Sequence, residues 1–210
     1  MTDLPPGAGA PDAGAALSYG WKKFQENAGP MLVVVLIPVA AQIVLGLIGR
    51  SVIHSLAAAL LFQVLGVVVS AIAGIGVYRM ALMITAGEPP DVGQAFRYDR
   101  MGGWIVFSFV FGLLVALGLI LCIIPGLLFL AYFGFAPFFF IDRGSSLGDA
   151  LTASRQAVQS KGLAFAVLLS IVVGVLGLIA CIVGVFVTEA VAYVAVAYLY
   201  RYATGQPVAA

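Results

Sequence analysis

Long uncharged stretches alternate with short polar segments along most of this chain. The first stretch, Met31–Gly49, has 19 residues without an ionisable side chain and ends at Arg50. The second covers Leu56–Tyr78, and its helical pattern continues to about Ala86. A helix rises about 1.5 Å per residue and the hydrocarbon core of a bilayer is about 30 Å thick. Each stretch is therefore long enough for one crossing, and the short segment between them predicts a helical hairpin.

The third apolar stretch is too long for a single crossing. Residues 101–141 are all uncharged, and as one helix they would be roughly twice as long as the bilayer core is thick. Proline removes a backbone donor and glycine permits a turn, so Pro125-Gly126 predicts the break. We therefore expect helices near residues 102–123 and 126–141.

The fourth stretch, residues 162–200, also has the length of two crossings, with Gly184 marking the expected turn. The four stretches together predict an all-α polytopic integral membrane protein with six transmembrane helices as three tandem hairpins. Before each hairpin lies a polar or amphipathic segment that ends in glycine, and each is expected to form a short interfacial helix. These segments are residues 17–29, 92–103 and 151–162.

Basic residues predict the orientation of these helices. Nine Lys and Arg residues fall on one side of the predicted topology, and only Arg50 falls on the other. Because basic residues near helix ends stay cytoplasmic, both termini are expected in the cytoplasm. The Pro-, Gly- and Ala-rich residues 1–16 predict a disordered cytoplasmic tail, followed by a membrane domain over residues 17–203 and a short cytoplasmic tail over residues 204–210.

Composition narrows the class of protein further. The chain is 63% hydrophobic and 9% charged, whereas a soluble domain has about 25% charged residues. With 10 basic and 9 acidic side chains, it also lacks the positive charge of a nucleic-acid binder. The sequence contains no metal-ligand spacing, nucleotide-binding loop or hydrolase motif. We therefore expect no nucleic-acid partner, no metal, no cofactor and no enzymatic activity.

The second and third hairpins resemble each other at an offset of 59 residues. The clearest match pairs GLILCI at residues 118–123 with GLIACI at residues 177–182. Either an internal repeat or the small apolar alphabet accounts for this match, and we favour the repeat. The repeat aligns Cys122 with Cys181. Two alternatives follow for these cysteines: a disulfide between the helix ends, or two buried free thiols.

Glu189 is the one carboxylate within a predicted span, and a charge inside the membrane is costly enough to indicate function. Its alternatives are a position at the outer interface or a neutral, hydrogen-bonded packing role. Arg50 and the sole histidine, His54, are candidate charge partners on the outer side. The candidate polar cluster, at similar predicted depths, consists of Glu189, Gln42, Gln63 and Tyr193.

The predicted interfacial helices carry candidate contacts to lipid headgroups. Basic and aromatic side chains on such helices face anionic lipid. The alternative is a connecting elbow that only directs the next span. The candidate headgroup contacts are Trp21, Lys22, Lys23, Arg155 and Lys161.

Two segments carry a resemblance to a known group of proteins. They are SYGWKKFQENAGP near the N-terminus and CIIPGLLFLAYFGFAPFFFIDRGSSLGDALTASRQAVQSKG in the second half. Over residues 17–203 the chain resembles bacterial polytopic membrane proteins of unknown function, similar to the membrane domain attached to some glycerophosphodiester phosphodiesterases. The resemblance implies a bacterial cytoplasmic membrane and a role in assembly, envelope or lipid handling. No catalytic residue carries over, because the soluble catalytic domain is absent from this sequence.

Two functions remain open at this point. The short loops and few polar groups favour a non-enzymatic scaffold, assembly factor or accessory subunit that binds membrane lipid and a protein partner or a second copy of itself. The alternative is a lipid-handling or small-molecule transport protein that uses a polar cavity around Glu189.

Overall fold

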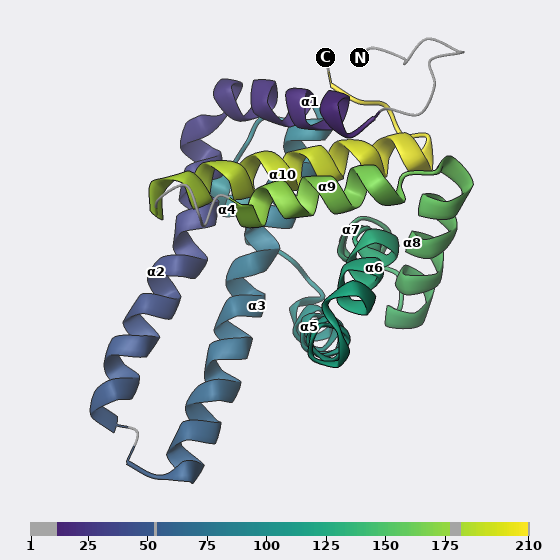
Figure 1. Ribbon diagram of the computed structural model, residues 1–210. Helices are drawn as coiled ribbons and strands as arrows, with labels where there is room; N and C mark the ends of the chain where they lie inside the picture. Colours follow the sequence, from purple (N-terminus) through teal and green to yellow (C-terminus); the bar gives the residue numbers. More distant parts are fainter. Residues whose placement is uncertain (1–11, 53, 177–181, 210) are drawn as a thin grey trace.

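The computed structural model describes residues 12–52, 54–176 and 182–209. This part of the chain is helical and contains no strand, which confirms the all-α prediction (Figure 1). The helices are α1 (Ala13–Glu26), α2 (Ala28–Val52), α3 (Leu56–Ala86), α4 (Val92–Ala95), α5 (Met101–Leu121), α6 (Ile123–Phe133), α7 (Ala136–Arg143), α8 (Leu147–Lys161), α9 (Ala164–Leu176) and α10 (Ile182–Thr204).

The first helix begins earlier than the predicted boundary at residue 17. The Asp12 carboxylate accepts a hydrogen bond of 2.7 Å from the Ala15 amide, and this N-cap starts α1 at Ala13. Ala13 and Ala16 are buried, so residues 13–16 belong to the packed structure rather than to a disordered tail. Residues 1–11 of that predicted tail lie outside the described residues.

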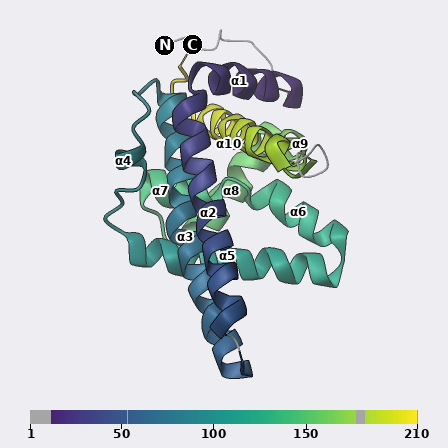
Figure 2. The same cartoon turned by 90° about the vertical axis from the view of Figure 1, so that its left-hand side faces the viewer.

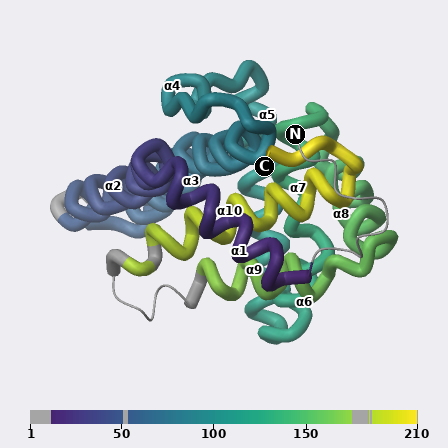
Figure 3. The backbone as a smooth tube through the Cα atoms, turned by 90° about the horizontal axis from the view of Figure 1, so that it is seen from above, coloured from purple at the N-terminus to yellow at the C-terminus, as the bar shows by residue number. Residues whose placement is uncertain are grey.

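Three pairs of consecutive helices pack against each other: α2 with α3, α5 with α6, and α9 with α10. The pairs run in different directions. In Figure 1, α2 and α3 extend away from the rest of the molecule, while α9 and α10 run across the upper part of α3. Figure 2 shows α5 running transverse to α2 and α3 at a lower level. Seen from above, α1 lies over α9 and α10 (Figure 3).

Four of the described helical segments are long and apolar enough to cross a membrane, or up to five if a bent pair counts as one span. That pair joins residues 147–161 and 164–174 and is bent by 113°. This count does not confirm the predicted six crossings, and it is compatible with a multi-pass membrane protein. The physical reason is partly length, since the 13 residues of α9 rise about 20 Å, less than the bilayer core. The four segments are Ala28–Arg50, Leu56–Ala86, Met101–Leu121 and Ile123–Arg143.

Two predicted breaks lie elsewhere in the structure. The chain turns at Cys122, which is extended, rather than at Pro125-Gly126. Pro125 lies in the first turn of α6, where its missing amide costs no intrahelical bond. Gly184, the other predicted turn, lies inside α10, so the connection to α9 falls before Ile182.

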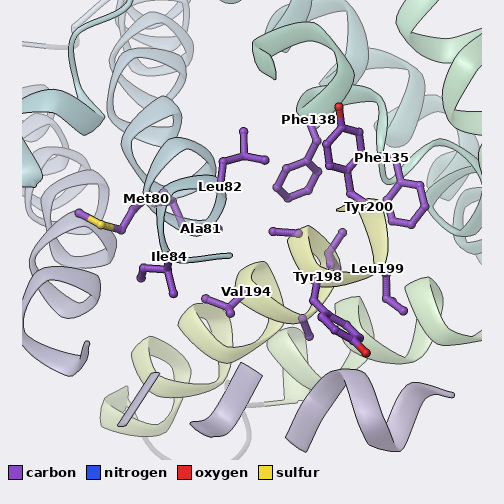
Figure 4. Close-up of a cluster of buried hydrophobic side chains, with 14 of the residues drawn as sticks. Met80, Ala81, Leu82, Ile84, Phe135, Phe138, Val194, Tyr198, Leu199 and Tyr200 are labelled. Carbon is purple, nitrogen blue, oxygen red and sulfur yellow. The ribbon is translucent and has the colours of Figure 1, made fainter. Parts of the chain in front are cut away.

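The core forms where α10 meets α1, α3 and α7. Figure 4 shows Tyr200 of α10 between Phe135 and Phe138, facing the end of α3. Its ring stacks on that of Phe138, with centroids 5.6 Å apart, and meets Phe139 edge to face at 4.9 Å. The Tyr200 hydroxyl donates a hydrogen bond of 2.6 Å to Asp142. Aromatic packing and one polar anchor therefore fix the end of α10 against α7.

Backbone contact fixes the crossing of α1 over α10. A Cβ atom at Gly20 would lie 2.5 Å from the carbonyl oxygen of Val191 and 3.2 Å from the amide of Ala195. Only glycine allows the two helices to approach this closely. The crossing covers the side of α10 that faces α1.

The end of α10 is also tied to the end of α3. The Arg201 guanidinium donates to the Thr85 hydroxyl at 3.0 Å and to the Leu82 carbonyl at 3.2 Å. It donates a third bond of 3.2 Å to the Pro207 carbonyl, and the Ala209 amide donates to the Thr85 carbonyl at 3.0 Å. These bonds hold the segment after α10 against the last turn of α3.

Candidate functional site

A large cavity lies between the α2–α3 pair and α5. Its volume is about 750 Å³. We call it the hairpin cavity. Small residues leave it open, because Cβ atoms added at Gly46, Gly74 or Gly112 would meet nothing within 4 Å. Its polar and charged lining residues are Gln42, Arg50, Gln63, Ser70, Tyr78, Trp104, Ser108 and Tyr193.

Two smaller cavities adjoin it at Tyr193. The side cavity, about 480 Å³, lies between α2, α3 and α10 and is lined by Gln42, Ser70 and Glu189 among others. The inner cavity, about 390 Å³, lies between α3, α6, α7, α9 and α10, and Glu189 lines it too. Tyr193 lines all three cavities, and Glu189 lines the two smaller ones.

Gln42 joins the two helices of the first pair. Its amide nitrogen donates a hydrogen bond of 3.1 Å to the Gly66 carbonyl and a second hydrogen bond to the Ser70 hydroxyl. Gly66 and Ser70 are one turn apart on α3, and their small size lets the amide reach the backbone of α3. These bonds place a polar bridge midway along two otherwise apolar helices.

Aromatic rings form the wall between the hairpin and inner cavities. The Tyr78 ring of α3 meets Tyr193 edge to face, with centroids 4.9 Å apart, and meets Trp104 of α5 in the same manner at 5.5 Å. The Trp104 indole nitrogen donates a hydrogen bond of 2.7 Å to the Ala71 carbonyl. This bond fixes α5 across α3 and gives the wall a defined position.

One buried polar atom in the hairpin cavity has no partner. The Ser108 hydroxyl oxygen on α5 is inaccessible to solvent and makes no hydrogen bond in the structure. A buried hydroxyl without a partner is costly, so such an atom calls for an explanation. The hydroxyl oxygen is closed off from the cavity, although other atoms of Ser108 line it.

The structure brings the predicted polar cluster together in two overlapping sets. Gln42, Glu189 and Tyr193 line the side cavity, and Gln42, Gln63 and Tyr193 line the hairpin cavity. Arg50 lines the hairpin cavity beside Gln63, whereas Glu189 does not, so these two charges face different cavities. His54 is exposed in the connection between α2 and α3 and lines none of these three cavities.

Of the predicted headgroup contacts on α1, one is buried. The Lys23 side chain is only 9% exposed and its ammonium group donates to Glu26 at 2.7 Å, whereas Lys22 is exposed and lies 4.0 Å from the same carboxylate. The long aliphatic stem of Lys23 packs under α1. The hydrogen bond from Lys23 lowers the pKa of Glu26 below its ordinary value of 4.5. Trp21 is 48% exposed.

On α8 the predicted headgroup contacts are accessible. Arg155 and Lys161 are both exposed, and the Lys161 ammonium lies 5.7 Å from the centre of the Tyr202 ring. The helix begins at an N-cap, where the Ser146 hydroxyl accepts a hydrogen bond of 3.2 Å from the Asp149 amide, and ends at Gly162 in the left-handed region. The predicted interfacial helix over residues 146–161 thus forms with its basic side chains on the surface.

Sequence reasoning missed a second polar cluster, at the end of α3 away from the hairpin tip. A cavity of about 210 Å³ there is lined by Arg79, Glu88, Asp142 and Arg201. The Asp142 carboxylate accepts from Tyr200 and, at 2.8 Å, from the Gln206 amide. These residues come from segments far apart in the chain, so no local spacing signals the cluster.

The described residues also bear on metal and thiol chemistry. Within residues 12–52, 54–176 and 182–209, no three His, Cys, Asp or Glu side chains come together as metal ligands. Cys122 is exposed at the turn between α5 and α6 with a free thiol. Cys181, its predicted partner, lies outside the described residues.

Comparison with known proteins finds relatives in mycobacteria. The chain is 31% identical over 132 residues to uncharacterized protein Mb2590 of Mycobacterium bovis and 30% identical over 132 residues to uncharacterized protein Rv2560 of Mycobacterium tuberculosis. The aligned region is 62% of this chain and 41% of each relative, so the chain matches less than half the length of these relatives. No family model matches the sequence, and no solved structure matches the fold. The names of these relatives say nothing of phosphodiesterases, and that resemblance stays a prediction.

Proposed function

We propose that this protein is a non-enzymatic membrane protein that binds a lipid or another small amphiphile between the α2–α3 pair and α5. The observation that carries the proposal is the hairpin cavity of about 750 Å³, whose lining mixes apolar side chains with Gln42, Gln63, Ser108 and Arg50. This volume lies within the range of about 300–1,000 Å³ typical of small-molecule sites. The predicted alternative, lipid handling, is thereby favoured over a purely structural role.

The lining fits an amphiphile better than a polar solute. Most of it is apolar, and its one charged residue among the described residues is Arg50. Glu189 lines the two adjoining cavities, which share Tyr193 with the hairpin cavity. A carboxylate in this position costs free energy to hold within a membrane, and such residues are typical of ligand or proton pathways.

The finer membrane arrangement belongs to the same proposal. We propose six crossings in three tandem hairpins related by an internal repeat, with both termini in the cytoplasm of a bacterium and the hairpins moving relative to each other as the ligand enters. Trp21, Lys22, Arg155 and Lys161 would then contact headgroups at the cytoplasmic surface. Support comes from the pairing of α2 with α3, α5 with α6 and α9 with α10.

A second candidate is a scaffold or accessory subunit that takes a partner helix in the same cavity. The ridge of Gly66, Ser70 and Gly74 on α3 favours it, because small residues one turn apart allow close approach of another helix. Gly74 has open space where a Cβ atom would be. The partner would be another membrane protein or a second copy of this chain.

Native mass spectrometry of the full chain, extracted gently from its own membrane, tests both candidates. We expect retained lipid or solute of defined mass, reduced in Gln42→Leu, which removes the polar bridge, and in Glu189→Gln. Gln159→Leu, on the exposed face of α8, is the matched control and should retain the ligand. A bound protein without lipid supports the scaffold, and a bare protomer contradicts both candidates.

A further inference from the structure

The hairpin cavity is elongated along α3. Its lining begins at Ala59 and reaches Tyr78, and these 20 residues of helix rise about 28 Å. That length is close to the thickness of a bilayer core, about 30 Å. A cavity of this length and moderate volume fits a chain-shaped molecule lying along the helix rather than a compact solute.

The charge on this cavity is confined to one end. Arg50 is the one charged residue among the described residues that line it, and it lies in the last turn of α2 at the tip of the hairpin. The opposite end is closed by the Tyr78 and Tyr193 rings, with the Glu189 carboxylate behind them in the adjoining cavities. The electrostatic potential along the cavity therefore favours an anionic group at the Arg50 end.

Polar side chains of the protein between the two ends of the cavity indicate which polar groups the ligand carries. Below Arg50 come the Gln63 amide and the bridge from Gln42 to Ser70. A fatty acid brings one polar group, its carboxylate, which Arg50 alone would satisfy. An ester-linked phospholipid brings a phosphate and also carbonyl acceptors that the Gln63 amide can bind.

We propose that the hairpin cavity selects an anionic phospholipid from the membrane, with its phosphate at Arg50 and an acyl chain along α3 toward Tyr78. This inference rests on the proposed function and adds the class of ligand and the residue that selects it. Arginine suits the role because its planar guanidinium offers paired donors to phosphate oxygens. Orientation follows from the position of the single charge, Arg50, at one end of the cavity.

The test is a competition between two lipids. The full chain is reconstituted into vesicles of equal phosphatidylglycerol and phosphatidylcholine, and the lipids that it retains after extraction are measured by native mass spectrometry. We expect retained phosphatidylglycerol to exceed phosphatidylcholine, and Arg50→Gln to reduce this preference roughly fivefold, the equivalent of about 1 kcal/mol for an exposed charge. Arg50→Lys should keep part of the preference.

Controls separate selection at Arg50 from general surface charge. Arg97→Gln removes an exposed arginine that follows α4 and lines none of the hairpin, side and inner cavities, and it should leave the preference unchanged. An equal loss in Arg97→Gln, an unchanged preference in Arg50→Gln, or retention of free fatty acid in place of phospholipid would overturn the inference. Lipid retained without preference contradicts this inference alone, whereas no retained ligand in the unaltered protein contradicts the proposed function itself.

Discussion

The two halves of α3 have the same apolar character and opposite surroundings. In the first half, Leu61 is 71% exposed and Leu56 is 77% exposed, whereas Ile75 and Met80 in the second half are fully buried. The second half is covered by α10, which crosses it, and by α5 through the Trp104 bond to Ala71. The first half packs on α2 and borders the hairpin cavity.

This contrast teaches that hydropathy and burial are separate properties in this chain. An apolar helix can meet lipid or protein at equal hydropathy, because lipid tails are as apolar as leucine side chains. Protein contact in the second half comes from α10, which lies more than 100 residues away in sequence. The exposed first half is the part of α3 that is free to contact lipid, and this is where we place the proposed ligand.

The largest effect that we expect comes from one pair of substitutions on α3. Ile75→Ala leaves a cavity in packed protein, and it should lower the free energy of unfolding by about 2–5 kcal/mol. Leu61→Ala removes a side chain that protein does not cover, and the change should stay within about 0.5 kcal/mol. Thermal unfolding of both variants in the same detergent measures the difference. Equal losses would mean that the first half of α3 is also covered by protein.

A second test concerns the crossing of α1 over α10. Gly20→Ala places a methyl group against the Val191 carbonyl, which is backbone and cannot rotate away, so α1 must shift. We expect a loss of about 1–3 kcal/mol, typical of overpacking. Gly29→Ala is the matched control, because a Cβ atom there meets nothing within 4 Å. A neutral Gly20→Ala in the same unfolding assay would show that α1 and α10 lie farther apart.

The smallest effect that we expect is on the melting temperature, from the Lys23–Glu26 pair on the surface of α1. The pKa of Glu26 is lowered below 4.5 by the hydrogen bond from Lys23, so its folded state holds the proton less tightly than the unfolded chain. The stabilisation from this pair is therefore complete above about pH 4.5 and is lost as the pH falls through the folded pKa. The difference in melting temperature between the protein and Glu26→Gln should shrink below that pH. A difference that grows on acidification would contradict the pairing.

Local signals predict the helices well and their packing poorly. The start of α3 at Leu56 and its end near Ala86 follow from the chain itself, because Ser55 caps the first turn and Gly87 takes the left-handed conformation after the last. The break at Cys122 was missed, because proline is a stop signal within a helix but is accepted in its first turn. The transverse course of α9 and α10 depends on contacts between distant segments, which hydropathy does not contain.

The sequence likewise predicts some residues of the candidate site and not others. Gln42, Glu189 and Tyr193 were predicted because polar side chains are rare in apolar stretches, and the structure brings them to one cavity. Tyr78 and Trp104 were not predicted as its wall, because aromatic side chains in apolar helices are common and carry no signal of their own. The partnerless Ser108 hydroxyl depends on the packing of α5 across α3, which the sequence does not specify locally.

The contact of α1 with α10 also constrains the order in which the molecule can be completed. Val191 and Ala195, which receive Gly20, follow it by about 170 positions in the chain. At a synthesis rate of roughly 5–20 residues per second, α1 exists for on the order of 10–30 s before its partner helix emerges. During that interval its apolar side has no protein to cover it, and the membrane surface offers an amphipathic helix a place to stay. The later helix α10 thus brings α1 into its final position.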